Sequence, residues 1–108
     1  IKRFENDYWG GSIKELINKI DFNKNKKIKI SVCGVSANVP KYYLRKRGFS
    51  NFEINRFENS DFIIMTNRAT INEKNNKLLN CFDKHNGEEI FNVSRNGVTL
   101  SSFRKINK

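Results

Sequence analysis

The sequence predicts an α/β fold, organised as a single small domain with a mixed sheet, two helices and a C-terminal β-hairpin. One segment spaces its apolar residues as a helix does, a second carries the start and stop signals of a helix, and others alternate or run apolar as strands do. Asn96-Gly97, set between two β-rich segments, is the strongest short-range hairpin signal in the chain. We therefore expect residues 1–108 to form one domain, with the order strand–helix–strand–helix–strand–strand followed by a hairpin.

The first elements centre on the segment Asp7-Tyr8-Trp9-Gly10-Gly11-Ser12. Before it, Ile1–Glu5 is expected to be an edge strand or the tail of a linker. The glycines and aromatic residues then predict an elbow, and Ser12 with Glu15 matches a capping box that starts a helix. That helix would run from about Ser12 to Ile20, because its apolar residues form one stripe: Ile13, Leu16, Ile17 and Ile20.

The next segment predicts a strand followed by a second helix. Ile28–Cys33 alternates apolar and polar residues, which is typical of a strand. Gly34 ends it, and Asn38 is expected to cap a helix with Pro40 in its first turn. Gly48 is expected to end that helix in the left-handed conformation.

The central part predicts two more strands. Phe52–Phe57 alternates as a short strand does, and Asp61–Thr66 is a continuous apolar run typical of a central strand covered on both faces. Asn67–Lys77 is polar and expected to be a loop. For Leu78–Phe82, the sequence leaves a helical turn and an extended segment both open.

At the C-terminus we expect strands over Ile90–Arg95 and Val98–Lys105. A type I′ turn with positive φ at both residues of Asn96-Gly97 would join them. With a two-residue turn, Val93 is expected to lie opposite Leu100. Phe103 then falls on the opposite face from Leu100, so a bulge or burial of both faces is expected.

The composition is strongly basic: 21 Lys and Arg residues against 11 Asp and Glu residues make a net charge of +10. Such a balance attracts nucleic acids, anionic lipid headgroups or acidic proteins without selecting one of them. The sequence has neither an apolar run long enough to cross a bilayer nor a signal peptide. It begins at Ile1 and not at a methionine, and we expect it to be part of a longer polypeptide.

Side chains suited to catalysis are few. His85 is the only histidine and follows no metal-ligand spacing, and the carboxylates form no obvious pair. We therefore predict no catalytic residue, no metal site and no cofactor. Cys33 and Cys81 lack the spacing of a zinc site; each is explained as a buried thiol, and a disulfide between them is the alternative outside the cytoplasm.

Two groups of residues are candidates for binding. An Asp beside Tyr and Trp suits a sugar or an interface, although the same residues also suit a structural role in a core and a turn; the group comprises Asp7, Tyr8, Trp9 and Ser12. A basic surface interleaved with tyrosines suits headgroups or nucleic acid, or is a solvated helix face; it comprises Lys41, Arg45, Lys46 and Arg47. No RNP, KH or zinc-finger signature supports nucleic acid as a partner.

Asp7-Tyr8-Trp9-Gly10, Ser12 and the amphipathic stretch that follows form a recognisable pattern. With Asn80-Cys81-Phe82-Asp83, Gly87 and Ile90–Ser101, it resembles the soluble C-terminal domain of bacterial polytopic membrane glycosyltransferases. That broad class includes the protein O-mannosyltransferases and aminoarabinose transferases, which take sugars from polyprenyl-phosphate donors. The resemblance spans nearly the whole chain, and departs at Gly11, where the family more often has a bulkier residue.

The resemblance implies a non-catalytic domain on the extracytoplasmic (periplasmic) side of a membrane. It would dock on the transmembrane part of the same polypeptide and help to shape the acceptor side, with Asp7, Tyr8, Trp9 and Ser12 as the hinge nearest that part. The catalytic acidic residues and the site for the polyprenyl-phosphate sugar donor would lie in the membrane part. The alternative is a free-standing basic module that binds nucleic acid or an acidic protein.

Overall fold

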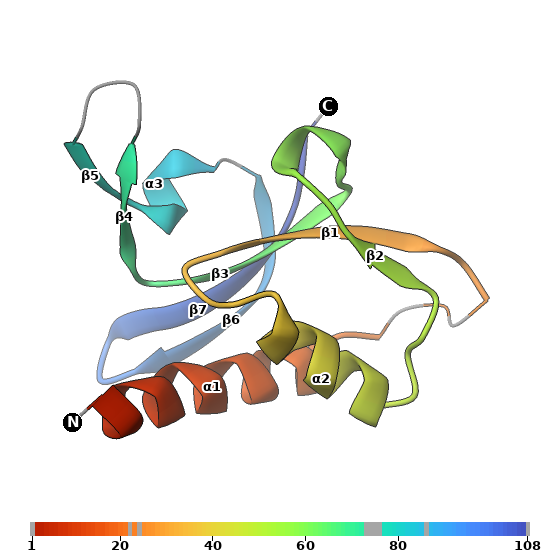
Figure 1. The fold of residues 1–108 in the computed structure, drawn as a ribbon, viewed down its shortest axis with the longest axis horizontal. Helices are drawn as coiled ribbons and strands as arrows, with labels where there is room; N and C mark the ends of the chain where they lie inside the picture. The colour runs from red at the N-terminus through yellow and green to blue at the C-terminus, as the bar shows by residue number, and fades with distance from the viewer. Residues whose placement is uncertain (1, 22, 24, 73–76, 86, 108) are drawn as a thin grey trace.

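The computed structural model describes residues 2–21, 23, 25–72, 77–85 and 87–107, and it confirms the α/β class (Figure 1). One five-stranded mixed sheet has the order β2-β1-β3-β7-β6, and a separate two-stranded sheet pairs β4 with β5. The elements are α1 (Lys2–Lys19), β1 (Ile28–Cys33), α2 (Asn38–Lys46), β2 (Phe52–Ile54), the 3-10 turn η1 (Phe57–Asn59), β3 (Phe62–Thr66), β4 (Ala69–Asn72), β5 (Lys77–Asn80), α3 (Cys81–Lys84), β6 (Glu88–Arg95) and β7 (Val98–Lys105).

Both faces of the large sheet are covered. Helices α1 and α2 pack on one face, and α3 and η1 lie on the other (Figure 1). Strand β3 shows this directly, because Ile64 packs with the helix residues Leu16 and Leu44 whereas its neighbours Ile63 and Met65 pack in a second cluster. The prediction of a central strand covered on both faces is therefore confirmed.

Helix α1 corrects the predicted start of the chain. The expected strand or linker at Ile1–Glu5 and the elbow at Asp7–Ser12 are wrong where the structure describes them, because the backbone is helical from Lys2 to Lys19. The capping box is wrong too, since the Ser12 and Glu15 side chains bond to residues on β7 and β6. Two consecutive glycines disfavour a helix by only about 1 kcal/mol each, so tertiary contacts can override them.

The apolar stripe on α1 is confirmed. Its four members are almost completely buried and belong to the larger core cluster: Ile13, Leu16, Ile17 and Ile20. They pack against β1, β3, β6 and β7 from one side of the sheet. Burial of side chains of this size contributes roughly 1.5–3 kcal/mol each, and this accounts for the helix being held on the sheet.

The segment from β1 to α2 follows the prediction with one change. Strand β1 has the predicted bounds, and α2 begins at Asn38 with Pro40 buried in its first turn. The cap position is Ala37, however, whose side chain makes no capping hydrogen bond; the Asn38 N–H donates to the Ser36 hydroxyl at 3.4 Å. Gly48 lies beyond the end of α2 with φ of 90°, as expected for a residue that ends a helix.

Two central predictions are corrected. The strand expected over Phe52–Phe57 is confined to β2, and the polypeptide then enters η1. The loop expected over Asn67–Lys77 instead contains β4 and the first residue of β5, which pair antiparallel. For Leu78–Phe82, the structure shows both an extended part in β5 and a helical turn in α3.

The C-terminal hairpin is confirmed. Asn96 and Gly97 have φ of 52° and 79°, and they join β6 to β7 in the expected tight turn. A bulge between Val93 and Ser94 shifts the register, so Val93 lies opposite Ser101 and not opposite Leu100. The bulge reconciles a two-residue turn with the burial of both Leu100 and Phe103.

Candidate functional site

The residues of the predicted elbow lie in one continuous helix. Asp7, Tyr8 and Trp9 lie within α1, and their side chains are outside the described part of the structure. Ser12 is buried, and its hydroxyl donates a 2.6 Å hydrogen bond to the Ser101 hydroxyl on β7. Ser12 therefore fastens α1 to the sheet and has no surface for an external ligand.

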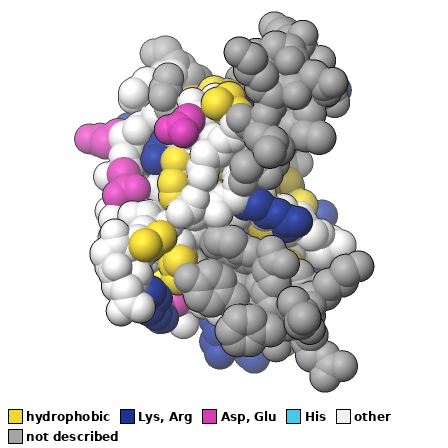
Figure 2. Space-filling view, turned by 90° about the vertical axis from the view of Figure 1, so that its left-hand side faces the viewer, with side chains coloured by type: hydrophobic (Ala, Val, Ile, Leu, Met, Phe, Trp, Pro, Cys, Tyr) yellow, Lys and Arg dark blue, Asp and Glu magenta, His cyan; other side chains and the backbone are white. Residues whose placement is uncertain are grey.

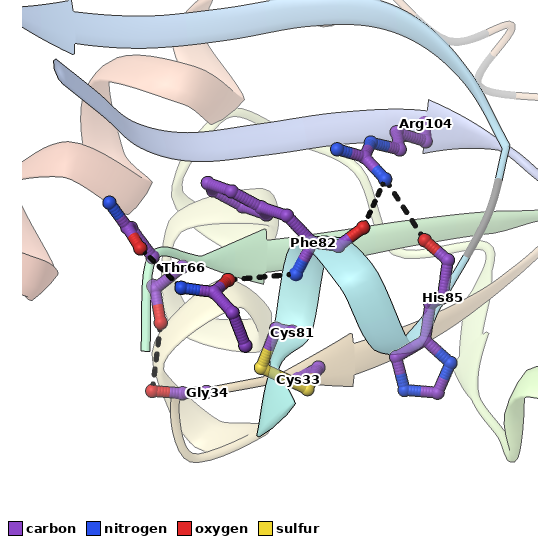
Figure 3. Close-up of a disulfide and its surroundings, with 9 residues drawn as sticks. Cys33, Gly34, Thr66, Cys81, Phe82, His85 and Arg104 are labelled. Carbon is purple, nitrogen blue, oxygen red and sulfur yellow. Dashed lines mark hydrogen bonds between the residues drawn. A yellow bond between two sulfur atoms is a disulfide. The ribbon is translucent and has the colours of Figure 1, made fainter. Parts of the chain in front are cut away.

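The carboxyl ends of β1 and β3 lie side by side at the point where ligands commonly bind in sheets of this kind. Here the space is filled by protein. A Cβ on Gly34 would lie 2.3 Å from Thr66 Oγ1, and the Thr66 hydroxyl donates a 2.9 Å hydrogen bond to the Gly34 carbonyl (Figure 3). The turn from β1 to α2 is thus a packed connection in which Gly34, at φ of 88°, allows the close approach.

A disulfide joins Cys33 at the end of β1 to Cys81 at the start of α3 (Figure 3). Their Cα atoms are 5.9 Å apart, and the two residues are 48 positions apart in the sequence. The sequence favours separate buried thiols, with the disulfide as the alternative; the structure shows the disulfide. The covalent link holds α3 over the carboxyl end of β1.

Short polar contacts hold α3 in place beside the disulfide. The Asn80 side chain accepts a 2.9 Å hydrogen bond from the Phe82 N–H, as a helix cap does. Arg104 Nη1 on β7 donates to the carbonyls of Phe82 and His85, each at 2.9 Å (Figure 3). The Arg104 guanidinium also lies 5.4 Å from the centre of the Phe82 ring. These groups fix the position of α3 from both ends.

His85 follows α3 and is half-buried, with its ring 4.7 Å from that of Phe57. Burial, and next the charge of Lys84, lower its pKa below the ordinary value of 6.5, against the opposing influence of Glu58. Within the described residues, no group of three or more His, Cys, Asp and Glu side chains is placed to hold a metal ion. His85 is thus a packed side chain at the end of α3, the helix that the disulfide holds on the sheet.

A basic surface lies on the outer side of α2. A hollow of about 450 Å³ is lined by residues spaced along one side of the helix; we call these the α2 surface: Asn38, Lys41, Tyr42, Arg45 and Lys46. Tyr42 is 58% exposed, and Lys46 Nζ lies 5.7 Å from the centre of its ring. The structure therefore brings together three of the four basic residues predicted to form a surface.

The fourth basic residue, Arg47, has a different role, and its assignment to this surface is wrong. Its Nη1 atom donates to the carbonyls of Ile17 and Ile20, at the C-terminal end of α1. The Ile17 carbonyl also accepts from the Ile20 N–H, and a cation complements the negative end of the helix dipole. Arg47 therefore joins the ends of the two helices.

A contact between α1 and β6 has no signal in the sequence. Arg95 makes a two-pronged ion pair with Glu15, with distances of 3.0 Å and 2.6 Å. The hydrogen bond from Arg95, more than its charge, lowers the pKa of Glu15 below the usual range. The partners are 80 positions apart, and no local pattern could reveal the pair.

Charge is unevenly spread over the molecule. On the side where α1 begins, acidic side chains gather at the upper left edge of the view, and exposed hydrophobic side chains lie among them (Figure 2). Between Asp21 and Glu53, by contrast, the sequence contains no acidic residue, and α2 lies in this interval. None of the described helices is long and apolar enough to cross a membrane.

Two features remain as candidates for the functional site. One is the α2 surface, and the other is the layer formed by α3, η1 and the disulfide on the opposite face of the sheet. The first offers cations and an aromatic ring to an anionic partner, and the second is packed with its own side chains. Comparison of this chain with protein-family models, with curated proteins and with solved structures finds no match.

Proposed function

We propose that this chain is a non-catalytic, extracytoplasmic domain of a membrane glycosyltransferase that uses a polyprenyl-phosphate sugar donor. In this proposal the domain docks on the transmembrane part of the same polypeptide and helps to shape the side on which the acceptor binds. The sugar-transfer chemistry takes place in that membrane part.

The observation that carries the proposal is the disulfide between Cys33 and Cys81. Disulfides persist in oxidising compartments such as the periplasm and are rare in the cytosol of most organisms. A covalent link between a sheet strand and α3 therefore agrees with the extracytoplasmic location that the sequence resemblance implies. It does not fit a module that binds nucleic acid in the cytoplasm.

The packing at the carboxyl ends of β1 and β3 supports a non-catalytic role. Sheets of α/β proteins commonly bind a ligand at this place. Here it is occupied by the Thr66 hydroxyl, the disulfide and helix α3. Access for a substrate would require displacement of covalently linked protein.

The test uses the full-length polypeptide expressed in bacterial cells. We expect it to fractionate with membranes and to transfer sugar from a polyprenyl-phosphate donor to its acceptor, whereas the 108-residue chain alone transfers none. Alkylation of free thiols before and after reduction should show Cys33 and Cys81 oxidised in cells. A Cys33→Ser, Cys81→Ser variant is the matched control for the thiol signal.

Two results would reject this function. The first is sugar transfer by the isolated chain. The second is a full-length protein with reduced cysteines that remains in the cytosolic fraction. In that case the alternative, a basic module for nucleic acid or an acidic protein, is examined by titration with salt, since such binding weakens steeply as salt increases.

A further inference from the structure

We propose that the α2 surface docks on the anionic phosphate headgroups of the membrane in which the parent protein is embedded. The inference rests on the proposed function and adds to it the surface that faces the lipid. It assigns to Lys41, Arg45 and Lys46 a binding role, and to Tyr42 a position at the headgroup level.

The cations of the α2 surface lack acidic partners among the described residues. Within the described part of the chain, the recorded ion pairs are Lys27 with Glu53 and Arg95 with Glu15. The cations of the α2 surface make other contacts: Arg45 lies 5.9 Å from the centre of the Phe52 ring, and Lys46 lies over Tyr42. No described carboxylate forms an ion pair with them, so they are available to an external anion.

The outward side of α2 combines an exposed aromatic ring with long cationic side chains. Pro40 and Leu44 face the core, and the opposite side of α2 presents Tyr42 with its flanking cations. Tyr42 packs edge-on against Tyr43 with ring centres 5.1 Å apart, and 58% of the residue remains exposed. Tyrosines are enriched at the level of lipid headgroups, and Lys and Arg extend their long side chains toward phosphate there.

Helix α2 is attached to α1 by a direct contact. Arg47 joins the C-terminal end of α1 to that of α2, and both helices lie on the same face of the sheet (Figure 1). Helix α1 is continuous from Lys2 through the paired glycines. A transmembrane segment connected through α1 would therefore hold the α2 surface in one fixed orientation.

Lipid is favoured over nucleic acid for two reasons. The disulfide agrees with a compartment outside the cytoplasm. The sequence carries no RNP, KH or zinc-finger signature of a nucleic-acid-binding domain. Because the Tyr42 ring is 58% exposed, stacking of a base on it is tested directly by competition with an oligonucleotide.

The experiment measures binding of the 108-residue chain to sedimenting vesicles. Vesicles of phosphatidylcholine are compared with vesicles of phosphatidylcholine and phosphatidylglycerol, at low and high salt. We expect binding to the anionic vesicles alone, weakened by salt. Because each cation near an anionic surface adds to the affinity, the variant Lys41→Gln, Arg45→Gln, Lys46→Gln should lose roughly a hundredfold in partitioning.

A variant with the same net charge is the matched control: Lys29→Gln, Lys84→Gln, Lys105→Gln. These three residues are exposed and lie outside α2, and we expect their loss to change binding only a few-fold. Circular dichroism of both variants checks that the fold is retained. A Tyr42→Gln variant should bind more weakly than the wild type without any change in charge.

Three results would overturn the inference. The first is equal loss in the two triple variants, which would show a response to net charge. The second is equal binding to the two kinds of vesicle. The third is displacement of the wild-type chain from vesicles by a trace of single-stranded oligonucleotide, which would assign the surface to nucleic acid. None of these outcomes bears on sugar transfer by the full-length protein, so this inference and the proposed function fail separately.

Discussion

The hydroxyl of Ser12 on α1 donates a 2.6 Å hydrogen bond to the hydroxyl of Ser101 on β7, and both side chains are buried. The Ser101 hydroxyl in turn lies 3.4 Å from the Ser12 carbonyl, to which it donates. This pair connects two segments 89 positions apart and holds the middle of α1 on the sheet. A buried polar group without a partner is costly. Removal of one hydroxyl therefore destabilises the protein more than its own contribution, because the other hydroxyl loses its partner.

Ser12→Ala should lower the free energy of unfolding by about 1–3 kcal/mol, because it leaves the buried Ser101 hydroxyl with a weaker set of partners. Urea denaturation measures the change. The double variant Ser12→Ala, Ser101→Ala should cost less than the sum of the single variants. Ser50→Ala, on an exposed loop, is the control. Additive effects at Ser12 and Ser101 would contradict the pairing.

Gly11→Ala should stabilise the protein by about 1 kcal/mol, because Ala favours a helix over Gly and nothing lies within 4 Å of the added Cβ. Thermal unfolding detects the gain. Gly34→Ala is the contrasting variant. Gly34 has φ of 88°, and an added Cβ would lie 2.3 Å from Thr66 Oγ1, so the free energy of unfolding should fall by about 2–4 kcal/mol. Destabilisation by Gly11→Ala would instead support the elbow that the sequence predicts.

Arg47→Ala should lower the free energy of unfolding by about 2 kcal/mol, since two carbonyls at the end of α1 lose a charged donor. Arg45→Ala, two positions earlier on the exposed side of α2, should change it by at most about 0.5 kcal/mol. Chemical denaturation of the two variants under the same conditions separates the structural arginine from the surface arginine. Equal costs would show that Arg47 does not join the helix ends.

His85 predicts a dependence of stability on pH. Its folded-state pKa is lowered by burial and by Lys84, so the unfolded state binds more protons below pH 6.5. The contribution is fully present above pH 6.5 and is lost as the pH falls from that value to the folded-state pKa. Denaturation at a series of pH values should show this slope in the wild type and a flatter curve in His85→Gln. An unchanged slope in that variant would assign the effect to another group.

Local patterns in the sequence were sufficient for the elements that carry their own signal. Strand β1, the apolar stripe of α1 and the turn at Asn96-Gly97 were each predicted from residues within the element. Alternation, helical spacing and a turn that needs positive φ are short-range requirements, and they act before any distant contact forms. The mixed α/β class follows from their order along the chain.

The tertiary structure alone decided the roles that depend on distant partners. The local signal at Ser12 indicates a helix start, but its hydroxyl bonds to Ser101; Arg47 lies among surface cations in the sequence, but its guanidinium reaches α1. Cys33 and Cys81 pair because the sheet and α3 place their Cα atoms 5.9 Å apart. In each case the partner lies on a remote segment of the chain, so only the folded arrangement brings the two groups together. For Ser12 and Arg47, the contact also supplies buried polar groups with hydrogen-bond partners.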